Sequence, residues 1–302
     1  MELTLPFAIH VPATSANLGP GFDVLGMALG LTNTVRVEAS DQVEVLVEGE
    51  GADELPAGAD NLVYRALAAV AARVGQAPPP VRLRCTNRIP LARGLGSSSA
   101  AIVAGLLAGN RLLRASLSTP DLLALATELE GHPDNVVPAL LGGVRICVRS
   151  EQGLLQTRIP LARPLQAVLF IPDLRMPTAA ARRVLPTMVP LADVVYNIGR
   201  VALLVAALVS GDYALLAEAT RDRLHQPARG VLFPALSALL AAALEGGAQG
   251  AFLSGAGSTI LALTEAESAA VAAALEAAAR REGVAGRTVI TTVREEGAQI
   301  LP

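Results

Sequence analysis

One stretch decides what this 302-residue chain can be: Pro90-Leu-Ala-Arg-Gly-Leu-Gly-Ser-Ser-Ser-Ala100. It follows a segment with the alternating pattern of a strand and opens a segment with helical periodicity. Gly94 and Gly96 permit positive φ and close backbone approach, so successive N–H groups can converge on an anion. Ser97 to Ser99 are predicted to cap the helix, whose N-terminus carries about half a positive charge. The pattern predicts a phosphate-binding loop, with a plain glycine and serine turn as the structural alternative.

The chain contains no lysine, because all 24 of its basic residues are arginine. A Walker A loop needs a lysine beside its last glycine, and a protein kinase needs a lysine on its third strand. Neither of these phosphate-handling solutions can operate here. Schiff-base chemistry on lysine is excluded for the same reason.

Composition excludes several further classes. With 52% apolar and 17% charged residues, the chain can bury a large core. A net charge of -3 and only 3% aromatic residues argue against a nucleic-acid partner. The longest apolar run, Val201 to Val209, is far short of the ~20 residues of a membrane helix, and no signal-peptide pattern opens the sequence. We therefore expect a cytoplasmic protein that is not in a membrane. Cys85 and Cys147 lack metal or disulfide spacing and are expected to be buried thiols.

The periodicity of the chain predicts a mixture of strands and helices. Strands are expected at 43–47, 81–85, 166–171 and 288–293, and helices at 62–72, 97–113, 120–130, 191–209, 234–244 and 265–282. The order is irregular, which favours an α+β fold over a doubly wound parallel sheet. A domain boundary is expected near 150–165.

Two other segments have glycines beside polar side chains. Pro12-Ala-Thr-Ser-Ala-Asn-Leu-Gly-Pro-Gly-Phe-Asp23 follows an apolar strand, so Asn17 and Asp23 should lie in the loop after it. An amide and a carboxylate there suit an ammonium group or a hydroxyl. Phe252-Leu-Ser-Gly-Ala-Gly-Ser-Thr-Ile260 lies between two strand-like runs. Taken singly, the first segment is a turn and the second a hairpin.

Together the three segments resemble the three motifs of the GHMP kinases (galactokinase, homoserine kinase, mevalonate kinase and phosphomevalonate kinase), in the same order across nearly the whole chain. The segment from Pro12 is similar to the homoserine kinase form of the first motif, and so is Glu130-Gly-His-Pro-Asp-Asn-Val-Val-Pro138. The resemblance implies a two-domain α+β fold: a ribosomal-S5-like ATP-binding domain at 1–155 and a ferredoxin-like C-terminal domain at 156–302. It also implies ATP and Mg²⁺ as cofactors, and a homodimer.

The resemblance assigns nucleotide and metal contacts. Asn61 and Val63 match the place where the family contacts adenine, although Asn61 also suits a helix cap. Ser98 and Glu130 match the Mg²⁺ ligands, with Glu128 as the fallback, and oxygen donors suit that hard cation. The backbone around the phosphates is assigned to Pro90, Leu91, Ala92, Arg93, Gly94, Leu95, Gly96, Ser97, Ser98, Ser99 and Ala100.

The same resemblance places L-homoserine. Its amino group is expected near Asp23, its hydroxyl near Asn17 and Asn135, and its carboxylate at Arg182 and Arg229. Two arginines can fork onto one carboxylate, where charge-assisted hydrogen bonds are worth ~1.5–3 kcal/mol each. Taken alone, an arginine is usually an ordinary surface residue.

The resemblance implies ATP-dependent phosphorylation of the homoserine hydroxyl, in threonine biosynthesis, with Asn17, Asn135 and His132 as catalytic residues. Asn135 stands where mevalonate and galactose kinases have a catalytic aspartate, so transfer is expected to be in line without a strong base. His132 equally suits an ordinary loop, and His10 and His225 are expected to be structural. Ser258 departs from the proline usual in the third motif. The alternatives are a GHMP kinase for another alcohol and a non-catalytic ligand-binding protein.

Overall fold

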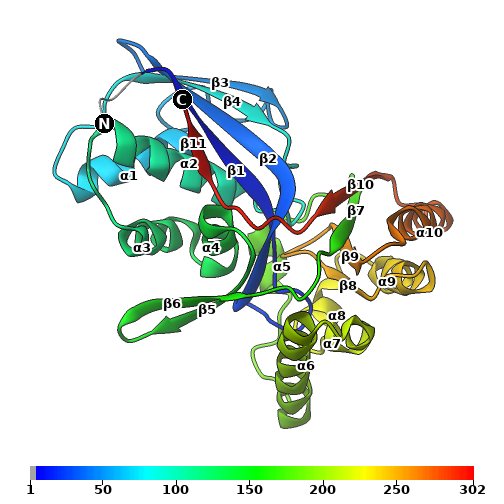
Figure 1. The fold of residues 1–302 in the computed structure, drawn as a ribbon. Coiled ribbons are helices and arrows are strands. Elements are labelled where there is room, and N and C mark those ends of the chain that lie inside the picture. Colours follow the sequence, from blue (N-terminus) through cyan, green and yellow to red (C-terminus); the bar gives the residue numbers. More distant parts are fainter. Residues whose placement is uncertain (1–4) are drawn as a thin grey trace.

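A computed structural model describes residues 5–302, which form two sheets, each covered by helices (Figure 1). The strands of the larger sheet run in the order β11-β1-β2-β4-β3, and β5 and β6 extend it as a hairpin on β2. Most neighbours are antiparallel, but β3 pairs with β4 in parallel. The strands are β1 (Phe7–Ala16), β2 (Leu25–Ala39), β3 (Glu44–Gly49), β4 (Val81–Asn87), β5 (Val144–Ser150), β6 (Gly153–Ile159) and β11 (Gln299–Leu301).

Four helices pack on one face of this sheet, on the left of Figure 1. They are α1 (Leu62–Arg73), α2 (Ser97–Leu112), α3 (Thr119–Glu130) and α4 (Pro133–Leu141). In α1, Val63, Ala66, Leu67 and Val70 are buried, and this three-and-four spacing gives the helix one apolar face. That face joins the inward residues of β1 and β2 in the main core.

The smaller sheet is fully antiparallel, in the order β10-β7-β9-β8. Its strands are β7 (Gln166–Pro172), β8 (Gly250–Leu253), β9 (Ile260–Thr264) and β10 (Gly286–Thr292), and α9 (Leu236–Glu245) and α10 (Ser268–Arg281) pack beside it. Five short or projecting elements lie between the sheets and at the lower edge of Figure 1: α5 (Thr178–Arg183), α6 (Leu191–Ser210), a 3-10 turn (Tyr213–Leu215), α7 (Leu216–Ala219) and α8 (Gln226–Arg229).

The predicted α+β class is confirmed, and the predicted helices and strands are present within a few residues of their limits. Both cysteines are buried, as expected. The domain limits remain a prediction: position 155 falls inside β6, and β11 returns from the chain end to pair with β1. By length and composition alone, α6 is the one helix of the described part of the chain that could cross a membrane, a property that helices of soluble proteins share.

Candidate active site

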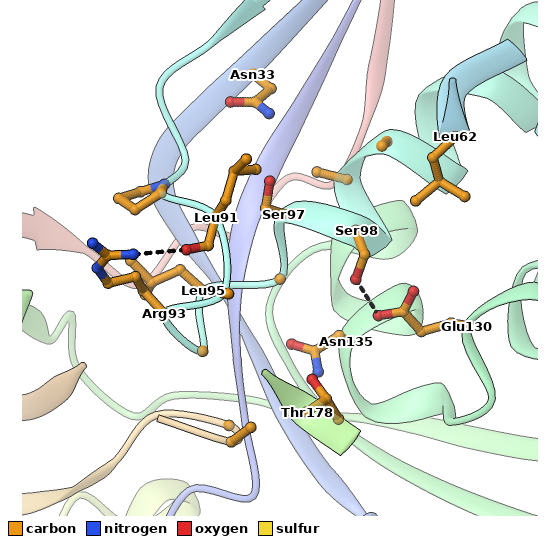
Figure 2. Close-up of a pocket in the computed structure, with 18 of the residues that line it drawn as sticks. Asn33, Leu62, Leu91, Arg93, Leu95, Ser97, Ser98, Glu130, Asn135 and Thr178 are labelled. Atoms are coloured by element: carbon orange, nitrogen blue, oxygen red, sulfur yellow. Dashed lines mark hydrogen bonds between the residues drawn. The ribbon is translucent and has the colours of Figure 1, made fainter. Parts of the chain in front are cut away.

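One cavity of about 380 Å³ lies where the loops between elements of both sheets meet (Figure 2). The phosphate-loop segment lines its middle. Asn61 and Val63 line one end, and Asp23, His132, Arg182 and Arg229 line the other. The structure therefore brings together, in one cavity, residues that lie up to about 210 positions apart in the sequence, and all but one of the predicted site residues line it. The exception is Ser99, whose side chain is fully buried below the loop.

The phosphate loop depends on two glycines in left-handed conformations. Gly94 has φ +73° and Gly96 has φ +69°. A Cβ on Gly94 would lie 2.0 Å from the carbonyl oxygen of Ser254, and one on Gly96 would lie 1.9 Å from Oγ1 of Thr14. The loop is thus packed against both of the other motifs, at distances that only glycine allows.

The prediction that Ser97 to Ser99 cap α2 was wrong. The N-cap residue is Gly96, which has no side chain to cap the helix, and the three serines are already the first residues of α2. The hydroxyls of Ser98 and Ser99 both donate to Oε1 of Glu130, at 2.6 and 2.8 Å. The first N–H groups of α2 thus have no side-chain cap, which suits an anion.

Ser98 and Glu130 lie close enough to share a divalent cation. Figure 2 shows the two side chains pointing toward one another across the cavity. A carboxylate and a hydroxyl are the hard oxygen donors that Mg²⁺ prefers, and Mg²⁺ is usually held by one or two carboxylates together with water and substrate phosphates. No cluster of three or more acidic, histidine or cysteine side chains occurs among residues 5–302. The residues therefore fit a cation bound mainly through a nucleotide.

Among the residues that line the cavity, Asn61 is the N-cap of α1. Its Oδ1 accepts from the backbone N–H of Val63 at 3.0 Å, and its Nδ2 donates to the carbonyl of Pro56 at 2.8 Å. The cap alternative is therefore present in the structure, and the predicted adenine contact remains a prediction. Asn33 and Asn87 also line the cavity and are hydrogen-bonded to one another at 3.1 Å. Sequence analysis missed both, because they are isolated polar positions in strands.

In the same cavity, two of the predicted substrate ligands bind each other. The guanidinium of Arg182 donates two hydrogen bonds to the carboxylate of Asp23, at 2.7 and 3.0 Å. This hydrogen bond raises the pKa of Arg182 above its ordinary value. Arg229 lies nearby and is only 2% exposed. Burial, followed by the like charge of Arg182, lowers the pKa of Arg229 to about 10, so it is still charged at neutral pH.

The two asparagines predicted to contact the hydroxyl are also held in place. Asn17, at φ +72°, donates to the carbonyl of Gly255 at 3.0 Å and accepts from the N–H of Asp23 at 3.1 Å. Asn135 accepts from the hydroxyl of Thr14 at 2.7 Å, which orients its amide. Thr178, the first residue of α5, also lines the cavity and is labelled in Figure 2. Thr178 was not predicted, although it lies in the segment that supplied Arg182.

Comparison with known proteins places this geometry in a family. The sequence profile of the GHMP kinases N terminal domain matches residues 61–143, and that of the GHMP kinases C terminal region matches residues 204–281. The chain belongs to the GHMP kinase family. It is 45% identical to homoserine kinase of Moorella thermoacetica, over 91% of this chain and 93% of that protein, and 42% identical to homoserine kinase of Desulfitobacterium hafniense, over 97% and 99%. The crystal structure of homoserine kinase from Cytophaga hutchinsonii superposes with a TM-score of 0.89 at 31% identity, covering 100% of this chain and 99% of that one.

In this GHMP kinase, His132 precedes α4 and forms a pair with Asp134. Its Nδ1 lies 2.6 Å from Oδ1 of Asp134, which is buried. Burial lowers the pKa of His132, but the hydrogen bond and charge of Asp134, with the charge of Glu130, outweigh it and leave the pKa above its ordinary value. A raised pKa favours the protonated imidazolium, which suits an anionic partner.

Behind Arg229, the fully buried His225 contacts both the arginine and the first-motif loop. Burial lowers the pKa of His225 to about 4, and the positive charge of Arg229 also lowers it, whereas the carboxylates of Asp222 and Asp23 raise it. The imidazole is therefore neutral at physiological pH.

We predict that Gly96→Ala will raise the Kd for Mg·ATP at least about tenfold, because left-handed backbone costs a non-glycine residue ~1–2 kcal/mol and the methyl would overlap Thr14. Isothermal titration calorimetry measures this. Gly75→Ala is the matched control, since Gly75 has φ +68° with no atom within 4 Å of a Cβ. An affinity for Gly96→Ala within twofold of wild type would contradict this account of the loop.

We also predict that His225 makes folding pH-dependent. Between pH 6.5 and about 4, the unfolded chain binds a proton at this imidazole and the folded protein does not, so the free energy of unfolding falls as pH falls. His225→Asn lacks this titration. Urea unfolding at pH 7 and pH 4.5 should therefore show a smaller stability difference between wild type and variant at pH 4.5. A difference that stays constant would show that the pKa of His225 is the same in the folded and the unfolded protein.

Proposed function

We propose that this chain transfers the γ-phosphate of ATP to the hydroxyl of L-homoserine, giving O-phospho-L-homoserine and ADP. One observation carries the proposal: a single cavity holds a phosphate loop at a helix N-terminus and, beside it, one carboxylate and two guanidinium groups. The homoserine kinase relatives support the same substrate. This reaction belongs to threonine biosynthesis, and we place it in the cytoplasm.

The charges at Asp23, Arg182 and Arg229 match those of an α-amino acid. Asp23 would accept from the ammonium group, and the two arginines would donate to the carboxylate. In the structure Asp23 and Arg182 already pair with one another. A zwitterion can replace that pair with an equivalent pair on each side, so binding leaves neither side chain without a partner. A singly charged alcohol that separated the pair would leave one of the two side chains without an opposite charge, and a neutral alcohol would leave both without one.

The chemistry proposed is direct in-line transfer. Asn135 cannot take a proton, but its amide, oriented by Thr14, can hold the attacking hydroxyl. A loose transition state needs little deprotonation of the nucleophile, and positioning can supply about 7–11 kcal/mol against roughly 3–5 kcal/mol from a general base. Mg²⁺, when bound at Ser98 and Glu130, neutralises charge on the phosphates. His132, whose pKa the hydrogen bond to Asp134 raises, lines the same cavity.

The test is ADP release from Mg·ATP with L-homoserine, mevalonate, shikimate and L-threonine offered separately, with the product identified by mass. We expect strong preference for L-homoserine. Turnover of mevalonate or shikimate instead would assign the site to another alcohol. Nucleotide binding without turnover of any alcohol would indicate a non-catalytic protein.

We also propose that the chain is a homodimer, and that α6 supplies the contact. Leu191, Val195, Ile198 and Val209 lie along one side of α6 at helical spacing and are exposed, Leu191 by 77% and Ile198 by 64%. The charged residues of α6, Asp193 and Arg200, are turned away and paired with Arg223 and Glu218. Membrane-surface helices carry unpaired basic residues beside the apolar stripe, which α6 lacks. If α6 of a second copy packs antiparallel against this helix, the two uncharged stripes cover one another.

Light scattering with size-exclusion chromatography is expected to give about twice the 31.0 kDa mass of one chain. Ile198→Asp should give the single-chain mass, whereas Leu46→Asp, an exposed apolar position on β3, should not change the wild-type result. A wild-type protein that is monomeric at micromolar concentration would contradict the proposal.

A further inference from the structure

The buried His225 connects Arg229, which lines the cavity, to the loop between β1 and β2. Nε2 of His225 lies 2.7 Å from the carbonyl oxygen of Gly19, and Nδ1 lies 2.9 Å from Nη1 of Arg229. A carbonyl oxygen only accepts and a guanidinium only donates. Both contacts can therefore be hydrogen bonds only if the imidazole is neutral, with its proton on Nε2. Asp222 lies 3.6 Å from Nε2, farther than Gly19.

This arrangement fixes the direction in which Arg229 presents its free edge. Nη1 donates to His225 and, at 2.8 Å, to the carbonyl of Gly255, and Nε points to the carbonyl of Ala181 at 3.4 Å. Among residues 5–302, no group accepts from Nη2. Since a guanidinium is planar, holding Nη1 and Nε leaves the two N–H groups of Nη2 as the part of the side chain available to a ligand.

The histidine is itself held by the turn in front of α8. The carboxylate of Asp222 accepts from the backbone N–H groups of Leu224, His225 and Gln226, at 2.7 to 2.9 Å, and from Nδ2 of Asn197 at 2.6 Å. With four donors, this buried carboxylate determines the backbone at His225. The imidazole has therefore one position from which to reach both Gly19 and Arg229.

We propose that His225 is a positioning residue for the substrate carboxylate, which it serves by accepting a hydrogen bond from Arg229 and so aiming Nη2 into the cavity. The inference rests on the proposed function and adds to it the residue that sets recognition of the carboxylate. This role differs from that of a histidine that only packs in the core, because replacing such a histidine would lower the activity with every substrate alike.

Two variants each remove one of the two hydrogen bonds of His225 and keep the other. In His225→Asn the amide oxygen occupies the place of Nδ1, so the bond from Arg229 is kept and the one to Gly19 is lost. In His225→Gln the amide nitrogen reaches the place of Nε2, so the bond to Gly19 is kept and the one from Arg229 is lost. Each is assayed with L-homoserine and with 3-aminopropan-1-ol, which is homoserine without its carboxylate, and the KM for ATP is measured alongside.

We expect His225→Gln to lower kcat/KM for L-homoserine roughly tenfold, the usual worth of one hydrogen bond to a charged group. The value for 3-aminopropan-1-ol and the KM for ATP should change less than threefold, and His225→Asn should keep most of the preference for homoserine. An equal loss for both substrates, or equal losses in both variants, would overturn the proposal. Wild-type turnover of L-homoserine tests the proposed function separately, because the role of His225 is read from the ratio between substrates.

Discussion

The carbonyl oxygen of Gly255 accepts hydrogen bonds from two side chains that come from distant parts of the chain. Asn17 of the first-motif loop donates at 3.0 Å, and Arg229 at the end of α8 donates at 2.8 Å. The neighbouring Ser254 hydroxyl lies 2.6 Å from the carbonyl of Gly94 in the phosphate loop and 2.8 Å from Oγ of Ser15. The hairpin between β8 and β9 thus joins the nucleotide side of the cavity to the substrate side. The site depends on this junction, because Arg182 and Arg229 come from α5 and α8, whereas the phosphate loop belongs to the part of the chain that forms the larger sheet.

The departure at Ser258 lies between residues that join the three loops. Ser254 and Gly255 precede it in the hairpin, and the backbone N–H of Thr259, which follows it, donates to the carbonyl of Arg93 in the phosphate loop at 3.2 Å. Ser258 is buried, and its hydroxyl bonds the carbonyl of Leu174. The residue that departs from the family pattern therefore stabilises the hairpin without touching the groups that bind ligand.

Much of the fold could be predicted from periodicity, and the elements that were missed have clear reasons. The helices α1, α2 and α6 have long apolar repeats, and their limits were predicted within a residue or two. The strands β6 and β11 were missed because they are largely exposed and lack an alternating apolar face. The strands β2 and β5 were missed although Val144, Ile146 and Val148 of β5 recur at every second position, a pattern that predicts a strand. The main site residues lie within motifs. The partners that fix them, Thr14 and His225, are ordinary residue types whose roles depend on neighbours far away in the sequence.

The central claim is that the cavity recognises both charges of an amino acid beside the phosphates. The most direct measurement compares kcat/KM of the wild-type protein for L-homoserine, 4-hydroxybutyrate, which lacks the ammonium group, and 3-aminopropan-1-ol, which lacks the carboxylate. Each removal leaves a charged side chain without a partner, so each should cost at least about 100-fold. If either analogue were phosphorylated as efficiently as L-homoserine, the assignment of Asp23, Arg182 and Arg229 to a zwitterion would be contradicted.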